Sequence, residues 1–122
     1  MAATGEDLSR ILSETGVVET DRLAELLHVT KGELALATGL SRDAVSKRAR
    51  AASPKTQQRL RDTIDIINRA VPWAGSTARA FAWFRSQPLP SFGDKTAEDL
   101  LKEGRAQAVK DYLSRIADGG YA

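Results

Sequence analysis

Apolar residues recur three and four positions apart along most of the chain, which is the spacing of one buried face of an α-helix. Clear examples are Leu60, Ile64 and Ile67, and later Val109 and Leu113. No stretch shows the alternation of apolar and polar residues that is typical of a half-buried β-strand. The pattern therefore predicts an all-α protein.

Capping residues and helix breakers divide this pattern into about seven helices. The expected starts carry a Ser or Thr that can cap a first turn: Thr4, Thr20, Thr30, Ser41, Ser53, Ser76 or Thr77, and Thr96. The expected ends lie at helix breakers: Gly16, Gly39, Pro72 with Gly75, and Gly104. A last helix is expected over residues 105–118. The segment SQPLPSFGDK, residues 86–95, is predicted to be a loop because two prolines and a glycine prevent helix propagation.

The length of 122 residues suits one compact domain or two very small lobes. The best internal boundary lies near residues 71–76, where the predicted long helix ends. We therefore expect an N-terminal region, residues 1–72, and a small C-terminal helical lobe, residues 73–122.

Charge is spread unevenly along the chain. Residues 31–61 contain eight basic and two acidic side chains, a net charge of +6, so the remainder carries −4. A basic middle suits a polyanion, and the separation of charge indicates more than one partner. A solvated helical surface rich in arginine explains the same charges equally well.

The sequence gives little support to catalysis. It contains no cysteine, and its one histidine, His28, lies at the end of an apolar helix stripe, where packing or capping explains it. No glycine-rich phosphate loop is present, and the Glu98-Asp99 pair falls in a first helical turn, where it favours the helix dipole. We expect no enzyme activity, metal, cofactor or small-molecule substrate. The absence of a membrane-spanning apolar run and of a signal peptide predicts a cytoplasmic protein without a membrane partner.

Residues 31–50, KGELALATGLSRDAVSKRAR, have the spacing of a helix-turn-helix. Ala35 is small where two helices cross, Gly39 falls in the turn, and Val45 packs the second helix back onto the first. The candidate DNA-binding residues are Ser41, which caps the second helix, and five residues that project from it: Arg42, Asp43, Ser46, Lys47 and Arg50. One position departs from the motif, because Arg48 stands where an apolar residue is frequent. A basic hairpin that only supports the fold or a dimer remains the alternative.

The C-terminal third carries a longer and more specific series of motifs. It runs from an aromatic helix with Trp83 and Phe84, through Pro88-Leu89 and the loop SFGDKTAEDLL, to Gly104, an amphipathic helix and the ending DGGYA. With the helix-turn-helix before it, this series resembles the Xre–MbcA–ParS antitoxin family. The resemblance covers residues 78–122 well and residues 31–70 more loosely. Asp94 stands where glycine is common, and Ala97 where proline commonly opens the helix, although Thr96 still supplies the cap.

The resemblance implies a two-part antitoxin of a type II toxin–antitoxin system. Residues 1–72 would form an Xre-like, DNA-binding and dimerising bundle, and residues 73–122 a toxin-binding lobe. The partner would be a RES-domain toxin that consumes NAD by phosphorolysis or hydrolysis, or uses it for ADP-ribosylation. The antitoxin would obstruct the NAD site of the toxin with its C-terminal segment. Other expected partners are operator DNA, through which it would repress its own operon, and a second copy bound through the N-terminal helices.

The candidate toxin-binding residues follow from the last helix and the segment after it. We expect Val109, Leu113 and Ile116 to face inward, and Arg105, Lys110, Tyr112 and Arg115 to lie near the edge of the helix. Glycines let the backbone approach another surface, and Tyr121 is a large anchor with a polar tip. The predicted site comprises Arg105, Tyr112, Arg115, Asp118, Gly119, Gly120, Tyr121 and Ala122. Asp118 and the terminal carboxylate would take the place of the anionic pyrophosphate.

Two other interpretations remain open at this stage. The chain could be a stand-alone helix-turn-helix regulator whose C-terminal lobe dimerises or senses another molecule. It could also be a structural adaptor, if a dimer buries its basic face. Composition alone would make DGGYA an ordinary helix end, and the resemblance is what favours the inhibitory segment.

Overall fold

The computed structural model describes residues 16–119, of which 74% lie in helices, with no β-strand in that range. In chain order the elements are α2 (Thr20–Leu27), α3 (Lys31–Thr38), α4 (Arg42–Ser46), α5 (Arg48–Ala51), α6 (Pro54–Ala74), α7 (Thr77–Ser86), the 3-10 helix η1 (Pro90–Phe92), α8 (Ala97–Lys102) and α9 (Ala106–Ala117). The predicted all-α class is confirmed. The first predicted helix, which would begin at Thr4 and end at Gly16, falls mostly outside the described residues.

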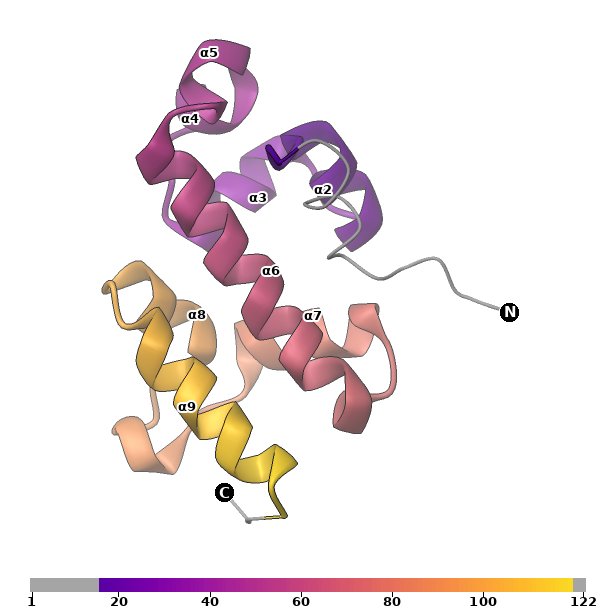
Figure 1. Cartoon of the computed structure of the whole chain (residues 1–122), viewed down its shortest axis with the longest axis vertical. Coiled ribbons are helices and arrows are strands. Elements are labelled where there is room, and N and C mark those ends of the chain that lie inside the picture. The colour runs from indigo at the N-terminus through magenta and orange to yellow at the C-terminus, as the bar shows by residue number, and fades with distance from the viewer. Residues whose placement is uncertain (1–15, 120–122) are drawn as a thin grey trace.

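Helix α6 is the long central element against which the others are arranged. It has 21 residues and crosses the molecule diagonally, with α2 to α5 near its beginning and α7 to α9 along its later part (Figure 1). Its first turn is well specified, because Ser53 caps it and Pro54 occupies the first helical position. Leu60, Ile66 and Ile67 are fully buried, so α6 contributes to the core on more than one side.

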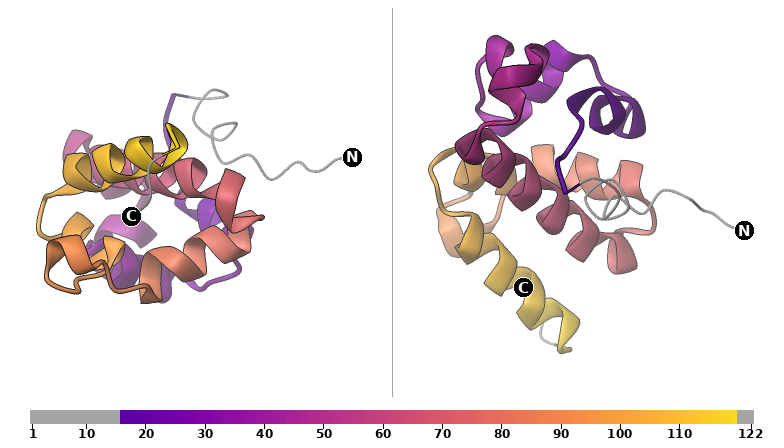
Figure 2. Two further views of the ribbon diagram at one scale, coloured as in Figure 1. Left: turned by 90° about the horizontal axis from the view of Figure 1, so that it is seen from below. Right: turned by 45° about the horizontal axis from the view of Figure 1, so that its top comes forward.

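One hydrophobic cluster runs through both halves of the described chain. It extends from Val18, before α2, to Leu113 in α9, and α3 contacts α8 directly across the expected boundary. Figure 2 shows the same arrangement from two other sides, and in its right-hand view α6 lies between the N-terminal helices and α9. The division into residues 1–72 and 73–122 therefore stays a prediction, since α6 serves both parts.

Most predicted helix starts carry the predicted caps. Thr30 with Glu33 and Thr96 with Asp99 form complete capping boxes, and Ser41, Ser53 and Ser76 each accept a hydrogen bond from the backbone two or three residues into their helices. His28 ends α2 in the left-handed conformation, with φ of 60°, so its capping role is confirmed.

One predicted helix start is wrong. Thr20 is not a cap but the first residue of α2, and its hydroxyl donates to the carbonyl oxygen of Val45 at 2.7 Å, which fastens α2 to α4. The helix end predicted at Pro72 with Gly75 is confirmed at Gly75, which follows the last residue of α6 and turns the chain with φ of 104°. Pro72 itself still lies in the last turn of α6, where its missing N–H removes only one intrahelical hydrogen bond.

The predicted loop at residues 86–95 is anchored to the rest of the protein at Leu89. Leu89 is buried, and its backbone N–H donates to the carbonyl oxygen of Lys95 at 3.0 Å. Between these residues lies η1, whose Phe92 packs toward α9. This loop therefore sets where α8 begins at Thr96.

The segment before α2 is attached to the rest of the molecule by Gln57, which is buried on α6. The side-chain nitrogen of Gln57 donates to the carbonyl oxygens of Val18 (3.1 Å) and Ala51 (2.7 Å). Its side-chain oxygen accepts the N–H of Val18 at 2.7 Å. One glutamine thus satisfies three backbone groups from two other segments.

We predict that Gln57→Leu lowers the free energy of unfolding by at least about 2 kcal/mol, because buried backbone groups left unpaired cost about 1–3 kcal/mol each. Urea unfolding followed by far-UV circular dichroism measures this. The matched control is Gln58→Leu: Gln58 is exposed and bonds only the side chain of Asp62, so we expect a change within about 0.5 kcal/mol. Equal losses in the two variants would contradict the role assigned to Gln57.

Candidate functional site

Helix α9 lies beside α6 and runs in the same direction (Figure 1). Val109 and Leu113 are buried against the core, and Ile116 is partly buried, as the apolar stripe predicts. The helix begins after Gly104, which has φ of 82°, and the sharp turn there brings α9 back over α8 and α6. The apolar stripe thus settles which face of α9 is turned inward.

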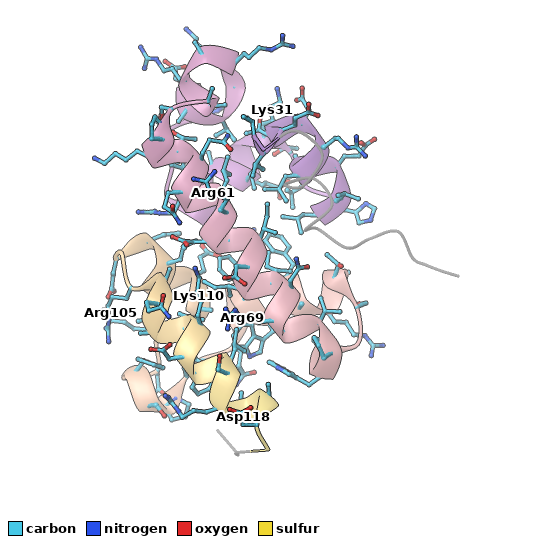
Figure 3. The ribbon with its side chains drawn as sticks, in the orientation of Figure 1. Lys31, Arg61, Arg69, Arg105, Lys110 and Asp118 are labelled. Atoms are coloured by element: carbon cyan, nitrogen blue, oxygen red, sulfur yellow. The ribbon has the colours of Figure 1, made fainter. Side chains whose placement is uncertain are left out.

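A row of charged and polar contacts joins α6 to α9; we call it the α6–α9 polar seam. It consists of Asp62, Asp65 and Arg69 on α6 and Lys110 and Ser114 on α9 (Figure 3 labels Arg69 and Lys110). The Lys110 ammonium lies 2.8 Å from a carboxylate oxygen of Asp62 and 3.3 Å from one of Asp65. The Arg69 guanidinium donates to the Ser114 hydroxyl at 2.9 Å.

Lys110 does not lie at the exposed edge of α9 as expected. Its side chain is only 15% exposed, because the two carboxylates of α6 hold it against that helix. Burial alone would lower the pKa of the Lys110 ammonium. The hydrogen bonds and negative charges of Asp62 and Asp65 outweigh burial and raise that pKa above its ordinary value. Lys110 is therefore a charged link between two helices.

Tyr112 was expected near the edge of α9, and the structure places it in the core instead. The residue is 7% exposed, and its ring meets the ring of Phe92 edge-on, with 5.9 Å between the centroids. Burial of the Tyr112 ring against the loop residue Phe92 is more favourable than its exposure to water, because the ring is a large apolar surface. In this conformation Tyr112 supports the loop and is not a surface contact.

The other described candidates on α9 are accessible. Arg105, Arg115, Asp118 and Gly119 are all exposed. The Arg105 guanidinium lies over the Phe92 ring, 5.6 Å from its centroid, at the beginning of the helix. Asp118 and Gly119 lie at the other end, where Gly119 has φ of 92° and turns the chain out of the helix. Gly120, Tyr121 and Ala122 lie outside the described residues.

The helix-turn-helix region forms only in part. Helix α3, the turn at Gly39 (φ of 74°) and the Ser41 cap are as predicted, and Val45 is buried. The second helix, however, stops at Ser46, because Lys47 is extended (φ −97°, ψ 122°) and a separate short helix, α5, follows.

The physical reason for this break lies at Arg48. That position carries no apolar side chain to hold a continuing helix against α3, and Arg48 is exposed. The chain instead buries Ala51 one turn later. The prediction of one continuous second helix for the DNA-binding candidates is thus wrong, because Lys47 separates α4 from α5.

All six DNA-binding candidates are nevertheless exposed: Ser41, Arg42, Asp43, Ser46, Lys47 and Arg50. The Ser41 hydroxyl caps α4, where it accepts a hydrogen bond from the N–H of Ala44 at 3.0 Å. Asp43 and Arg50 form a weak pair across the break, 3.9 Å apart. These side chains share the α4–α5 surface but do not project from one helix.

No metal site or membrane span is found in the described part of the chain. Within residues 16–119, no group of three His, Asp or Glu side chains is placed to hold a metal ion. None of the helices there is both long and apolar enough to cross a membrane.

Comparison with protein families identifies the C-terminal part. Residues 69–119 match the model of the antitoxin Xre/MbcA/ParS C-terminal toxin-binding domain. The chain therefore carries the C-terminal toxin-binding domain of the Xre/MbcA/ParS antitoxins. The match begins near the end of α6 and continues through α7, α8 and α9 to Gly119. The exposed residues of α9 therefore belong to a toxin-binding domain. No curated protein and no solved structure matches the antitoxin.

We predict that Lys110→Met lowers the free energy of unfolding of the antitoxin at pH 7 by about 1.5–3 kcal/mol, the range for hydrogen bonds to charged groups. Because folding raises the pKa of Lys110, its stabilisation is complete below the ordinary value of 10.5. It is lost as the pH rises through the raised value. The difference between wild type and variant should therefore shrink at high pH.

Chemical denaturation at pH 7, 9 and 11 provides the measurement. Lys95→Met is the control, since Lys95 pairs with Glu103 but is 45% exposed, and a surface pair contributes less than about 1 kcal/mol. A difference for Lys110→Met that stays constant up to pH 11 would show that its charge does not hold α9 to α6.

Proposed function

We propose that the antitoxin neutralises a RES-domain, NAD-consuming toxin by occluding its active site with the C-terminal segment. The toxin would be an NAD phosphorylase or hydrolase, or an ADP-ribosyltransferase. The antitoxin performs no chemistry itself. The observation that carries this proposal is the end of α9, which is exposed, lies in the toxin-binding domain and leads directly into the segment from Gly119 onward.

The chemistry at that end suits a site that binds a dinucleotide. A pocket for a pyrophosphate is cationic, and Asp118 offers it a carboxylate at the tip of α9. Gly119, already at positive φ, allows a close approach of backbone to the toxin. Arg115 lies near that end as an exposed cation for acidic groups around the pocket, and Arg105, at the opposite end of α9, would meet acidic groups elsewhere on the toxin. Gly120, Tyr121 and Ala122 would enter it, with Tyr121 as the anchor.

The proposal predicts that an antitoxin ending at Asp118 folds but no longer neutralises its toxin. NAD turnover by the purified product of the adjacent gene is measured alone, with full-length antitoxin and with the truncated form. Full-length antitoxin should suppress turnover and the truncated form should not. Circular dichroism and the thermal midpoint confirm that the truncated form is folded, since α9 retains its core contacts.

The other outcomes of this assay are equally informative. If both forms suppress turnover, the toxin is inhibited from elsewhere on the toxin-binding domain and the occluding segment is ruled out. If the neighbour consumes NAD and neither form affects it, the pairing with a RES-domain toxin is wrong. A stand-alone helix-turn-helix regulator then becomes the better description of this chain.

A second activity, repression of its own operon, is supported by the basic middle of the chain. The α4–α5 surface exposes Arg42, Lys47 and Arg50, and residues 31–61 carry a net charge of +6. Because the second helix is split at Lys47, we expect phosphate contacts to contribute more than base contacts on one continuous helix would. Dimerisation through the N-terminal helices would place two such surfaces on one operator.

Lys47→Glu combined with Arg50→Glu should abolish salt-sensitive binding to promoter DNA, because two phosphate contacts become repulsive. Fluorescence anisotropy with promoter DNA at 50 and 200 mM salt gives the affinity and its salt dependence. Reversal of two exposed arginines outside this surface, Arg79→Glu with Arg115→Glu, changes the net charge equally and should retain binding. No binding by the wild type at low salt would end the case for operator binding.

A further inference from the structure

The two tryptophans of the antitoxin meet at one edge of the toxin-binding domain. Trp73 lies near the end of α6 and Trp83 on α7, with ring centroids 5.3 Å apart and an interplanar angle of 89°. Trp83 is partly buried and packs against the core, whereas Trp73 is 43% exposed. Trp83 thus contacts the Trp73 indole in a T-shaped arrangement, and a little under half of the Trp73 surface stays accessible to water.

Single exposed apolar residues are common on protein surfaces, so the position of Trp73 matters more than its exposure alone. Among the residues that the structure describes, the large apolar side chains exposed to this degree are Val17, Leu36 and Trp73. Val17 and Leu36 precede the segment that matches the family model, and Trp73 lies inside it. Tryptophan is also the residue type most enriched among the energetically dominant contacts of protein interfaces.

The α6–α9 polar seam shows where Trp73 lies relative to the end of α9. The seam joins Lys110 to Asp62 and Asp65, and then Ser114 to Arg69, so residues advance together along two parallel helices (Figure 3). One helical turn beyond Arg69 on the same face is Trp73, and one turn beyond Ser114 is Asp118. The exposed indole therefore lies at the same level as the exposed end of α9.

We propose that Trp73, held by Trp83, is the apolar anchor of the toxin interface, and that it inserts into a hydrophobic pocket of the toxin beside the site approached by the end of α9. This rests on the proposed function, because it takes the toxin as the partner. Continuity favours that partner, because the anchor and the end of α9 lie at the same level along two parallel helices of a segment that matches a toxin-binding domain. A large rigid ring contributes affinity at little cost in conformational entropy, while the end of α9 supplies specificity.

Fluorine NMR of the intact antitoxin tests this with 5-fluorotryptophan at both positions. The chain has two tryptophans, so two signals are expected, and Trp83→Phe assigns them. Unlabelled toxin, the purified product of the adjacent gene, should shift or broaden the Trp73 signal. In parallel, calorimetry compares wild type with Trp73→Ala, for which we expect the dissociation constant to rise about 30-fold or more. Leu36→Ala, at a more exposed apolar side chain outside the domain, should bind like wild type.

The outcomes separate this inference from the proposed function. If the toxin binds wild type and Trp73→Ala equally, and the Trp73 signal stays unchanged, the anchor is wrong although the antitoxin function stands. If the Trp73 signal instead responds to antitoxin concentration without toxin, the indole packs against a second copy and the inference is also overturned. If wild type does not bind the toxin at all, the proposed function itself fails.

Discussion

Helix α6 packs against hydrophobic surface from both halves of the antitoxin. The positions of the remaining helices follow from which part of α6 each one covers. Leu60, Ile66 and Ile67 are completely buried on it, each worth about 1.5–3 kcal/mol relative to exposure. The first part of α6 receives the N-terminal helices through Gln57 and the later part receives α7 and α9. A toxin-binding domain that begins near residue 69 is therefore built on a helix whose beginning is held by the N-terminal region.

The α6–α9 polar seam fixes the register of α9 along α6. Apolar stripes alone would let α9 slide along α6, since hydrophobic burial is not directional. The pairing of Lys110 with Asp62 and Asp65 fixes one level of the two helices, and the bond from Arg69 to Ser114 fixes the next. In consequence the end of α9 emerges at a set level along α6, one turn beyond the bond from Arg69 to Ser114, so the proposed inhibitory segment would start from a fixed position.

Much of this structure could be predicted from the sequence because local rules decide it. The Thr30 and Thr96 capping boxes and the Gly39 turn depend on residues within a few positions of each other. The errors involve partners distant in sequence. Lys110 and Tyr112 look like surface residues on α9 until the carboxylates of α6 and the ring of Phe92 are brought beside them. The break at Lys47 likewise follows from what α3 can bury, although the charged Arg48 was a usable signal. Trp73 carried no signal, because an aromatic near an apolar helix end is usually core.

The central claim is that the antitoxin meets its toxin with the end of α9 and the neighbouring end of α6. Hydrogen–deuterium exchange of the full-length antitoxin, with and without saturating toxin, tests it without any substitution. We expect toxin to slow exchange in the second half of α9 and the last turns of α6, and to leave α4 and α5 unchanged. Protection confined to the α4–α5 surface, with exchange at the end of α9 unaltered, would contradict the account.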